Sequence, residues 1–140
     1  MKVSTKGLYS IRAMFDLATL YGEGPVPISR IAAHQSVSIP YLEQLFSVLR
    51  KEGLINSVRG VQGGFELTKS PGEITLGDIL LPLEGQVAPV KCVSHNEECD
   101  SIIGCPSRVI WKTLNDKING VLDSVTLQDM IDECKAQEGS

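Results

Sequence analysis

The sequence has few aromatic residues, only two histidines and no long apolar run. Aromatic residues make up 5% of the 140-residue chain, with a single tryptophan. No apolar stretch approaches the ~20 residues of a membrane-spanning helix, and residues 1–7 lack the apolar segment of a signal peptide. We therefore expect a cytoplasmic protein without a membrane partner. Neither His34 nor His95 has a nucleophile context around it, so we expect no enzyme.

Charge is divided unevenly along the chain. Residues 1–70 contain eight Lys or Arg against five acidic residues, a net charge of +3, whereas residues 71–140 contain five against twelve, a net charge of −7. The length suits one compact domain or one domain with an extension. The overall charge of −4 does not exclude a polyanion as partner, because the basic half can provide the surface that binds it.

The first half of the chain is expected to form three helices and a β-hairpin. Apolar spacing predicts a helix over 4–22, a short helix from Pro27 to about Ala33, and a third helix over 41–51 that Ser38 caps. Its apolar stripe contains Leu42, Leu45, Phe46 and Leu49. Strand-like runs at 54–58 and 65–68 flank a glycine-rich turn. This order of elements is typical of a winged helix-turn-helix.

In the second half, capping boxes at 75–78 and 126–129 mark two helix starts. We expect the first helix to end near Leu83 and the last to run through Ile131, with 135–140 as a frayed tail. Between them, Pro106 begins a long helix to about Asp123. Its apolar positions approximate a heptad spacing: Val109, Ile110, Leu114, Ile118, Val121 and Leu122. A symmetric dimer is one use of that stripe, and packing within the same chain is the other.

Three cysteines lie close together in the acidic, irregular segment before the long helix. Cys92, Cys99 and Cys105 have the spacing C-x6-C-x5-C. Thiolates favour zinc, copper(I) or iron–sulfur clusters, and the wide gaps suit a cluster better than a paired zinc motif. The candidate fourth ligands are His95, Glu97, Glu98, Asp100 or a residue of a partner subunit. Three unliganded thiols are the alternative, and Cys134 is expected to be a packed thiol.

The exposed faces of the third helix and the hairpin carry side chains suited to DNA. Gln44 can pair with adenine, and Tyr41 and Ser47 can reach bases or phosphates. Glu43 either accepts from a cytosine amine or penalises wrong sequences. Arg59 can enter a narrow minor groove. The alternative is an ordinary solvated surface, but the order of elements favours DNA binding. The glycines do not form a nucleotide loop, because the Gly-Lys-Ser/Thr ending is missing.

With these features, the chain resembles the Rrf-type winged-helix family of bacterial transcription regulators over residues 1–130. The resemblance is most specific in Ser4-Thr5-Lys6-Gly7, in the run 41–46, in the wing 58–64, and in the three-cysteine segment followed by Trp111. It implies a mainly α fold with a small β-hairpin wing, a homodimer and a palindromic double-stranded operator. Its IscR branch implies a 2Fe–2S cluster on three cysteines and a histidine. Its NsrR branch implies a 4Fe–4S cluster, and its CymR branch a protein partner.

This sequence departs from the IscR pattern in two ways. The first gap between cysteines is one residue longer, and Arg108 stands where the histidine would be. An arginine does not ligate iron, which leaves His95 or a nearby carboxylate as the fourth ligand. The carboxylate of NsrR-like members would fall at Leu8, and Asp16 is a further option.

We therefore expect three parts: a DNA-binding domain over 1–83, a cluster-binding loop over 84–105, and a dimerisation helix with a terminal helix over 106–134. The expected DNA-binding residues are Lys6, Ser38, Tyr41, Glu43, Gln44, Ser47, Arg50, Lys51, Arg59 and Gly60. Cluster occupancy would control DNA affinity at genes for iron–sulfur cluster biogenesis, by repression or activation. Sensing by thiol oxidation, by zinc or through a cysteine-metabolism partner is the alternative.

Overall fold

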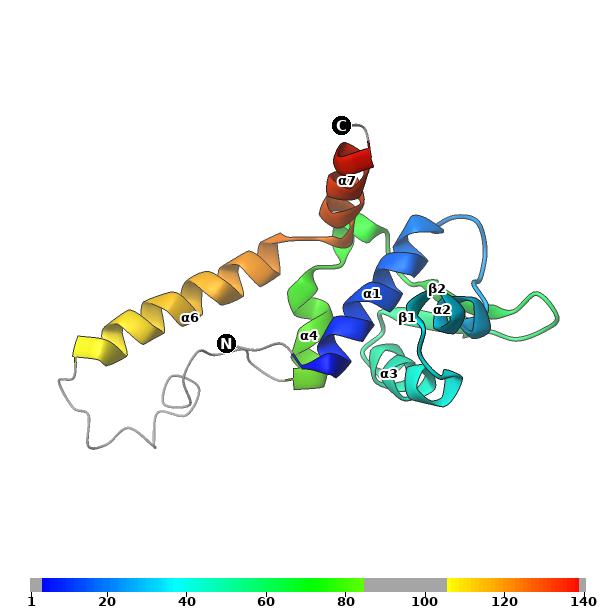
Figure 1. The fold of residues 1–140 in the computed structure, drawn as a ribbon, viewed down its shortest axis with the longest axis horizontal. Coiled ribbons are helices and arrows are strands. Elements are labelled where there is room, and N and C mark those ends of the chain that lie inside the picture. The colour runs from blue at the N-terminus through cyan, green and yellow to red at the C-terminus, as the bar shows by residue number, and fades with distance from the viewer. Residues whose placement is uncertain (1–3, 85–105, 139–140) are drawn as a thin grey trace.

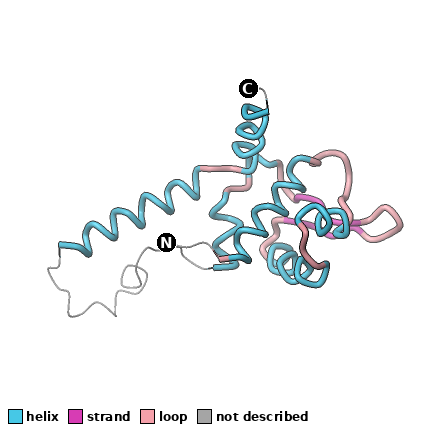
Figure 2. Tube along the Cα trace, in the orientation of Figure 1, coloured by secondary structure: helices cyan, strands magenta, loops and turns pink. Residues whose placement is uncertain are grey.

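The computed structural model describes residues 4–84 and 106–138 (Figure 1). Helices dominate this part of the chain, and one small hairpin projects from it (Figure 2). The described residues form six α-helices, a short 3-10 helix and a two-stranded antiparallel sheet. This confirms the expected fold class, a mainly α winged helix-turn-helix with an additional long helix.

The helix-turn-helix consists of α1 (Thr5–Thr19), α2 (Ile28–Gln35) and α3 (Ile39–Lys51). Ser36 makes the tight turn between α2 and α3 with a φ of 57°. Ser38 caps α3 as expected, because its Oγ accepts a hydrogen bond from the Tyr41 backbone N–H at 3.3 Å. The expected end of the first helix was three residues too late: Leu20 is its C-cap, and Gly22 has already turned to a φ of 90°.

The wing is the hairpin of β1 (Ile55–Val58) and β2 (Gly64–Leu67). Val26, just before α2, pairs with Phe65 through two backbone hydrogen bonds of 2.8 Å each and fastens the wing to the helices. The Phe65 ring meets Phe46 of α3 edge-on, with centroids 4.8 Å apart. A Cβ on Gly64 would overlap the Val26 carbonyl, so only glycine allows this close approach.

The core lies between α1, α3, α4 and the wing. The expected stripe of α3 is confirmed, because Leu42, Leu45, Phe46 and Leu49 are all at most 2% exposed. Met14 and Leu17 of α1 pack against the same core.

After the wing come η1 (Pro71–Glu73), α4 (Leu76–Glu84), α6 (Pro106–Ser124) and α7 (Leu127–Glu138). Both capping boxes are confirmed. The Asp78 N–H donates to Thr75 Oγ1 and the Thr75 N–H to the Asp78 carboxylate, and Thr126 and Asp129 repeat this pair. The starts of α4 and α7 lie side by side, joined by Leu76 N–H to Val125 O at 2.9 Å and Leu127 N–H to Ile74 O at 3.0 Å.

The last helix is longer than expected. α7 continues to Glu138, so the expectation of an end near Ile131 and a frayed tail from 135 was wrong. Lys135, Ala136, Gln137 and Glu138 are all good helix formers, and α7 packs on α1 and η1. α6 packs on α4, and its N-terminal end extends away from the other helices (Figure 1). In the described ranges, no helix has the length and hydrophobicity to cross a membrane.

Candidate nucleic-acid interface

Helix α3 presents a polar face opposite its apolar stripe. Glu43, Gln44, Arg50 and Lys51 are exposed, and Ser47 is half-buried among them. Residues three and four positions apart share a side of a helix, so Gln44, Ser47 and Lys51 form one row. The helix packs against β1, at the end of the molecule away from α6 (Figure 1). The structure therefore brings the expected base-reading residues together on one accessible surface.

The N-terminus of α3 is suited to a phosphate. Ser38 is exposed and uses its oxygen as the cap acceptor, which leaves its hydroxyl proton free for another acceptor. The helix dipole favours an anion at this end, although Pro40 has no N–H and the Tyr41 N–H is already bonded to Ser38. Lys6, which is also exposed, lies in the first turn of α1.

The tip of the wing follows directly on β1. Arg59 and Gly60 are exposed, as the DNA prediction requires, and Gly60 has a φ of 120° that favours glycine. Val61 is fully exposed at the tip. A Cβ on Gly63 would overlap the Val58 carbonyl, so this glycine is needed to close the loop.

An aromatic contact that the sequence did not reveal joins α1 to α3. The rings of Tyr9 and Tyr41 meet edge-on with centroids 6.2 Å apart. The Arg12 guanidinium lies over the Tyr9 ring, 5.4 Å from its centroid. Tyr41 is consequently half-buried and held from one side, and it is not a freely rotating surface residue.

A polar network joins α1 to α2. Asp16 is only 8% exposed. Its Oδ2 is 2.9 Å from His34 Nδ1 and accepts a 2.9 Å hydrogen bond from Gln35 Nε2. The carboxylate therefore has structural partners, and we do not retain Asp16 as a ligand for a cluster. An acid placed between Phe15 and Leu17 in an apolar stripe was the available signal for this burial.

The N-terminus of α1 holds the end of α4. The backbone N–H and hydroxyl of Ser4 both donate to the carboxylate of Glu84, the first at 2.7 Å. A Cβ on Gly7 would lie 2.6 Å from Glu84 Oε1 and 2.9 Å from Leu80 Cδ2. One contact with Glu84 thus accounts for both Ser4 and Gly7 in the run 4–7. The same contact holds Glu84, the last residue of α4, in place.

Helix α6 exposes large apolar side chains. Val109 is 69% exposed, Ile110 64% and Val121 58%, and Trp111 and Leu114 are also exposed. Ile118 and Leu122 are half-buried and Asn115 is buried, and α6 packs on α4. The helix therefore keeps one side against its own chain and leaves an apolar side uncovered.

Cys92, Cys99, Cys105 and the candidate ligands His95, Glu97, Glu98 and Asp100 lie outside the described residues. Within the described part, no three His, Cys, Asp or Glu side chains come together as a metal site. Leu8, at the position of the carboxylate expected for NsrR-like members, is 45% exposed and offers no donor atom. Arg108 lies in the first turn of α6.

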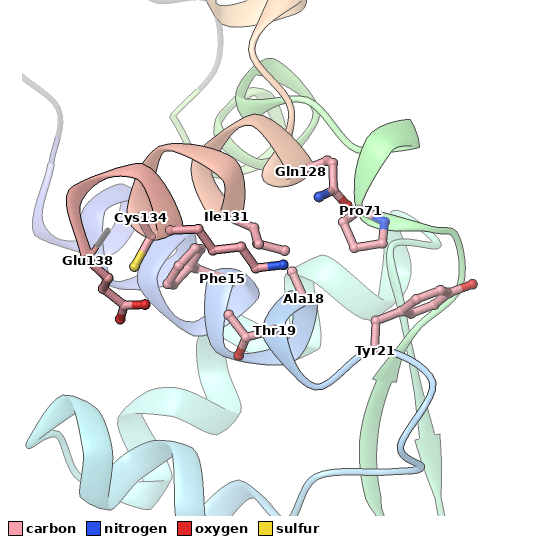
Figure 3. Close-up of a pocket in the computed structure, with 10 residues that line it drawn as sticks. Phe15, Ala18, Thr19, Tyr21, Pro71, Gln128, Ile131, Cys134 and Glu138 are labelled. Atoms are coloured by element: carbon pink, nitrogen blue, oxygen red, sulfur yellow. The ribbon is translucent and has the colours of Figure 1, made fainter. Parts of the chain in front are cut away.

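Cys134 is half-buried on α7 and lines a pocket of about 360 Å³ between α1, η1 and α7 (Figure 3). Phe15 and Ile131 line the same pocket, and α7 lies on the side of α1 away from α3 (Figure 1). The pocket is thus separate from the nucleic-acid interface.

The chain resembles known transcriptional regulators over nearly its whole length. Residues 3–133 match the sequence profile of Rrf2, described as an iron-dependent transcriptional regulator. The HTH-type transcriptional regulator IscR of Photorhabdus laumondii is 39% identical over 131 residues, which cover 94% of this chain and 79% of that protein. The HTH-type transcriptional regulator CymR of Bacillus subtilis is 42% identical over 130 residues, 93% of this chain and 89% of that protein.

A solved structure of an IscR from T. potens superposes with a TM-score of 0.78. It is 46% identical, and the match covers 98% of this chain and 91% of that one. These relatives are named as regulators and not as enzymes.

Proposed function

The chain belongs to the Rrf2 family of transcriptional regulators, and from this premise we propose that it is a homodimeric DNA-binding regulator with an iron–sulfur cluster on its cysteine segment. The observation that carries this proposal is the set of three thiols at C-x6-C-x5-C, placed between α4 and α6. The winged helix-turn-helix would bind a palindromic operator in the cytoplasm. The cluster would report iron–sulfur or redox status to genes of cluster biogenesis.

In this proposal, the row on α3 enters the major groove. Gln44 and Ser47 read base edges, Glu43 restricts the accepted sequence, and Tyr41 contacts the edge of the site. Phosphates are bound by Lys6, Ser38, Arg50 and Lys51. Arg59 and Gly60 of the wing enter the minor groove, where a narrow A·T tract attracts arginine.

The uncovered side of α6 supports the homodimer. Several large apolar side chains on one helix would be unfavourable in water, and the same helix from a second subunit is the simplest cover for them. A dimer with two-fold symmetry also matches a palindrome, because each subunit reads one half-site.

The donor set fits an iron–sulfur cluster. Cys92, Cys99 and Cys105 supply soft thiolates, and Cys105 directly precedes the N-terminus of α6, where the helix dipole favours a thiolate. With Asp16 bound to His34, the fourth ligand would come from His95 or a carboxylate of the same segment. A bound 2Fe–2S cluster would supply a centre that gains or loses an electron; a 4Fe–4S cluster is the alternative form.

The test is an anaerobic ultraviolet–visible spectrum with iron and sulfide quantified per chain. We expect charge-transfer absorption that is lost when Cys92, Cys99 and Cys105 are replaced together by Ala, whereas Cys134→Ala keeps it. Operator affinity should change with cluster occupancy in the wild type and not in the triple variant. Arg59→Ala should weaken specific binding by about 1–3 kcal/mol. A protein without colour or iron after anaerobic reconstitution would overturn the cluster.

The 42% identity to CymR of B. subtilis favours a second candidate, a regulator that senses through thiol oxidation, zinc or a cysteine-metabolism partner. A colourless protein that binds DNA, with zinc or a disulfide found by analysis, would support it. A partner protein would be expected at the acidic half of the chain, whose net charge is −7.

A further inference from the structure

The contact of Tyr9, Tyr41 and Arg12 has no role in the function proposed so far. Its members come from two elements. Tyr9 and Arg12 lie on α1, and Tyr41 lies in the first turn of α3. Tyr9 and Tyr41 are half-buried, whereas Arg12 is exposed. The three groups form a row that runs from the recognition helix out to solvent.

The arrangement is suited to holding Tyr41 in place. An edge-to-face pair at 6.2 Å and 88° is a favourable geometry for two aromatic rings. The Arg12 guanidinium lies 5.4 Å from the centroid of the Tyr9 ring, and this cation–π contact favours the observed position of Tyr9. Arg12 thus stabilises Tyr9, and Tyr9 restricts the rotation of Tyr41.

The charge of Arg12 is also available to a ligand. Within the described residues the one ion pair is His34 with Asp16, so no carboxylate there neutralises Arg12. Tyr9 is three residues from both Lys6 and Arg12 and therefore neighbours each of them on the surface of α1. The guanidinium is within about 12 Å of the Tyr41 ring, given the two centroid distances of 6.2 and 5.4 Å. The major groove is about 12 Å wide, so a group at this distance from the edge of α3 can reach the flanking phosphates.

We propose that Arg12 binds a DNA phosphate from α1 and, through the ring of Tyr9, positions Tyr41 at the edge of the recognition helix. The inference rests on the proposed DNA-binding function. It extends the DNA contacts of α1 beyond its first turn and assigns Tyr9 as a positioning residue that does not itself read the sequence.

The test measures binding to two duplexes, one selected from a random-sequence pool by the wild-type protein and one unrelated duplex of equal length. Affinities are measured over a series of salt concentrations. Arg12→Ala should make the negative slope of log K against log salt less steep by about 0.9 and weaken binding by roughly 5- to 10-fold at 0.1 M salt. Because a phosphate contact carries no sequence information, its loss should weaken binding to both duplexes by the same factor. A further loss on the selected duplex alone reports the positioning of Tyr41 through Tyr9. Arg12→Lys should restore the slope.

Lys135→Ala is the matched control, because Lys135 is an exposed cation on α7, away from α3. It should leave slope and affinity unchanged. Tyr9→Leu keeps an apolar side chain but removes the ring, and it should lower the ratio of selected to unrelated affinity. Tyr9→Phe should keep that ratio, and thermal unfolding checks that each variant is folded.

Each result separates the claims. An unchanged slope for Arg12→Ala would overturn the phosphate contact, and an unchanged ratio for folded Tyr9→Leu would overturn the positioning role. If Tyr9→Leu does not fold, the double variant Arg12→Ala/Tyr41→Phe tests the coupling between Arg12 and Tyr41. Its selected-to-unrelated affinity ratio is compared with the value expected from the product of the two single-variant effects. Equality of the two values would overturn the positioning role. If the wild type selects no duplex, the DNA-binding proposal itself fails.

Discussion

Replacing Gly64 by Ala should loosen the wing without removing any side chain that contacts DNA. The new Cβ would overlap the Val26 carbonyl and lie 2.7 Å from the Pro27 backbone nitrogen. Both are backbone atoms that cannot rotate away, so β2 has to move. The two Val26–Phe65 hydrogen bonds and the Phe65–Phe46 ring contact would weaken together.

The expected loss of stability follows from these contacts. Two hydrogen bonds at about 0.5–1.5 kcal/mol each and one aromatic pair at about 0.5–1.5 kcal/mol give a decrease of about 1.5–4.5 kcal/mol in the free energy of unfolding. A fall of roughly 5–15 °C in Tm should accompany it. Urea unfolding followed by circular dichroism measures the first quantity, and a thermal scan the second.

Gly72→Ala is the matched control for this substitution. Its new Cβ would find no atom nearer than Gln128 Cβ at 4.0 Å, so the variant should stay within about 0.5 kcal/mol of the wild type. Gly64→Ala should also weaken operator binding at a temperature where it is folded, because Arg59 is carried on the same hairpin. A Gly64→Ala protein as stable as the control would refute the reasoning.

Two further perturbations test other parts of the molecule. Leu114→Asp should shift the protein from dimer to monomer in sedimentation velocity, because it places a charge on the uncovered side of α6. Lys112→Asp on the same helix is the control. An unchanged oligomeric state in both variants would contradict the dimer surface. Glu84→Ala should reduce the free energy of unfolding by about 1 kcal/mol through loss of the Ser4 hydrogen bonds. Ser4 Oγ also accepts from the Gly7 N–H and caps α1, so Ser4→Ala should destabilise in either background but less in the Glu84→Ala background. Full additivity would argue against the Ser4–Glu84 contact.

Local signals were enough to predict much of the fold. Ser38, Thr75 and Thr126 each cap a helix by accepting a hydrogen bond from the backbone N–H three residues later. The capping residue and its partner therefore lie in one short stretch of sequence. The α3 stripe was predicted for the same reason, because its period is local. The end of α7 was not predicted, because the polar residues 135–138 were interpreted as a frayed tail. They are good helix formers, and they continue a helix that packs against α1.

The contacts that organise the candidate site could not be predicted in this way. Ser4 and Glu84 are 80 residues apart, and Asp16 and His34 are 18 apart. Tyr9 and Tyr41 come from different helices. The residues around Asp16 indicate its burial, but only the packing of α1 against α2, α3 and α4 gives Asp16, Tyr9 and Ser4 their partners. The class of transcriptional regulator was more accessible than this geometry, because the order of helices and wing follows from local patterns.

The paired starts of α4 and α7 fix the point from which α6 leaves the fold. Residues 74–76 and 125–127 are joined there by backbone hydrogen bonds, and α6 leaves this point as a rod of 19 residues, about 28 Å long at 1.5 Å per residue. A rotation of about 5° at this point would therefore displace its far end by roughly 2.5 Å. That far end adjoins the cysteine segment. In the proposed homodimer, a change of this size would alter the separation of the two DNA-binding domains, which has to match half-sites about 34 Å apart.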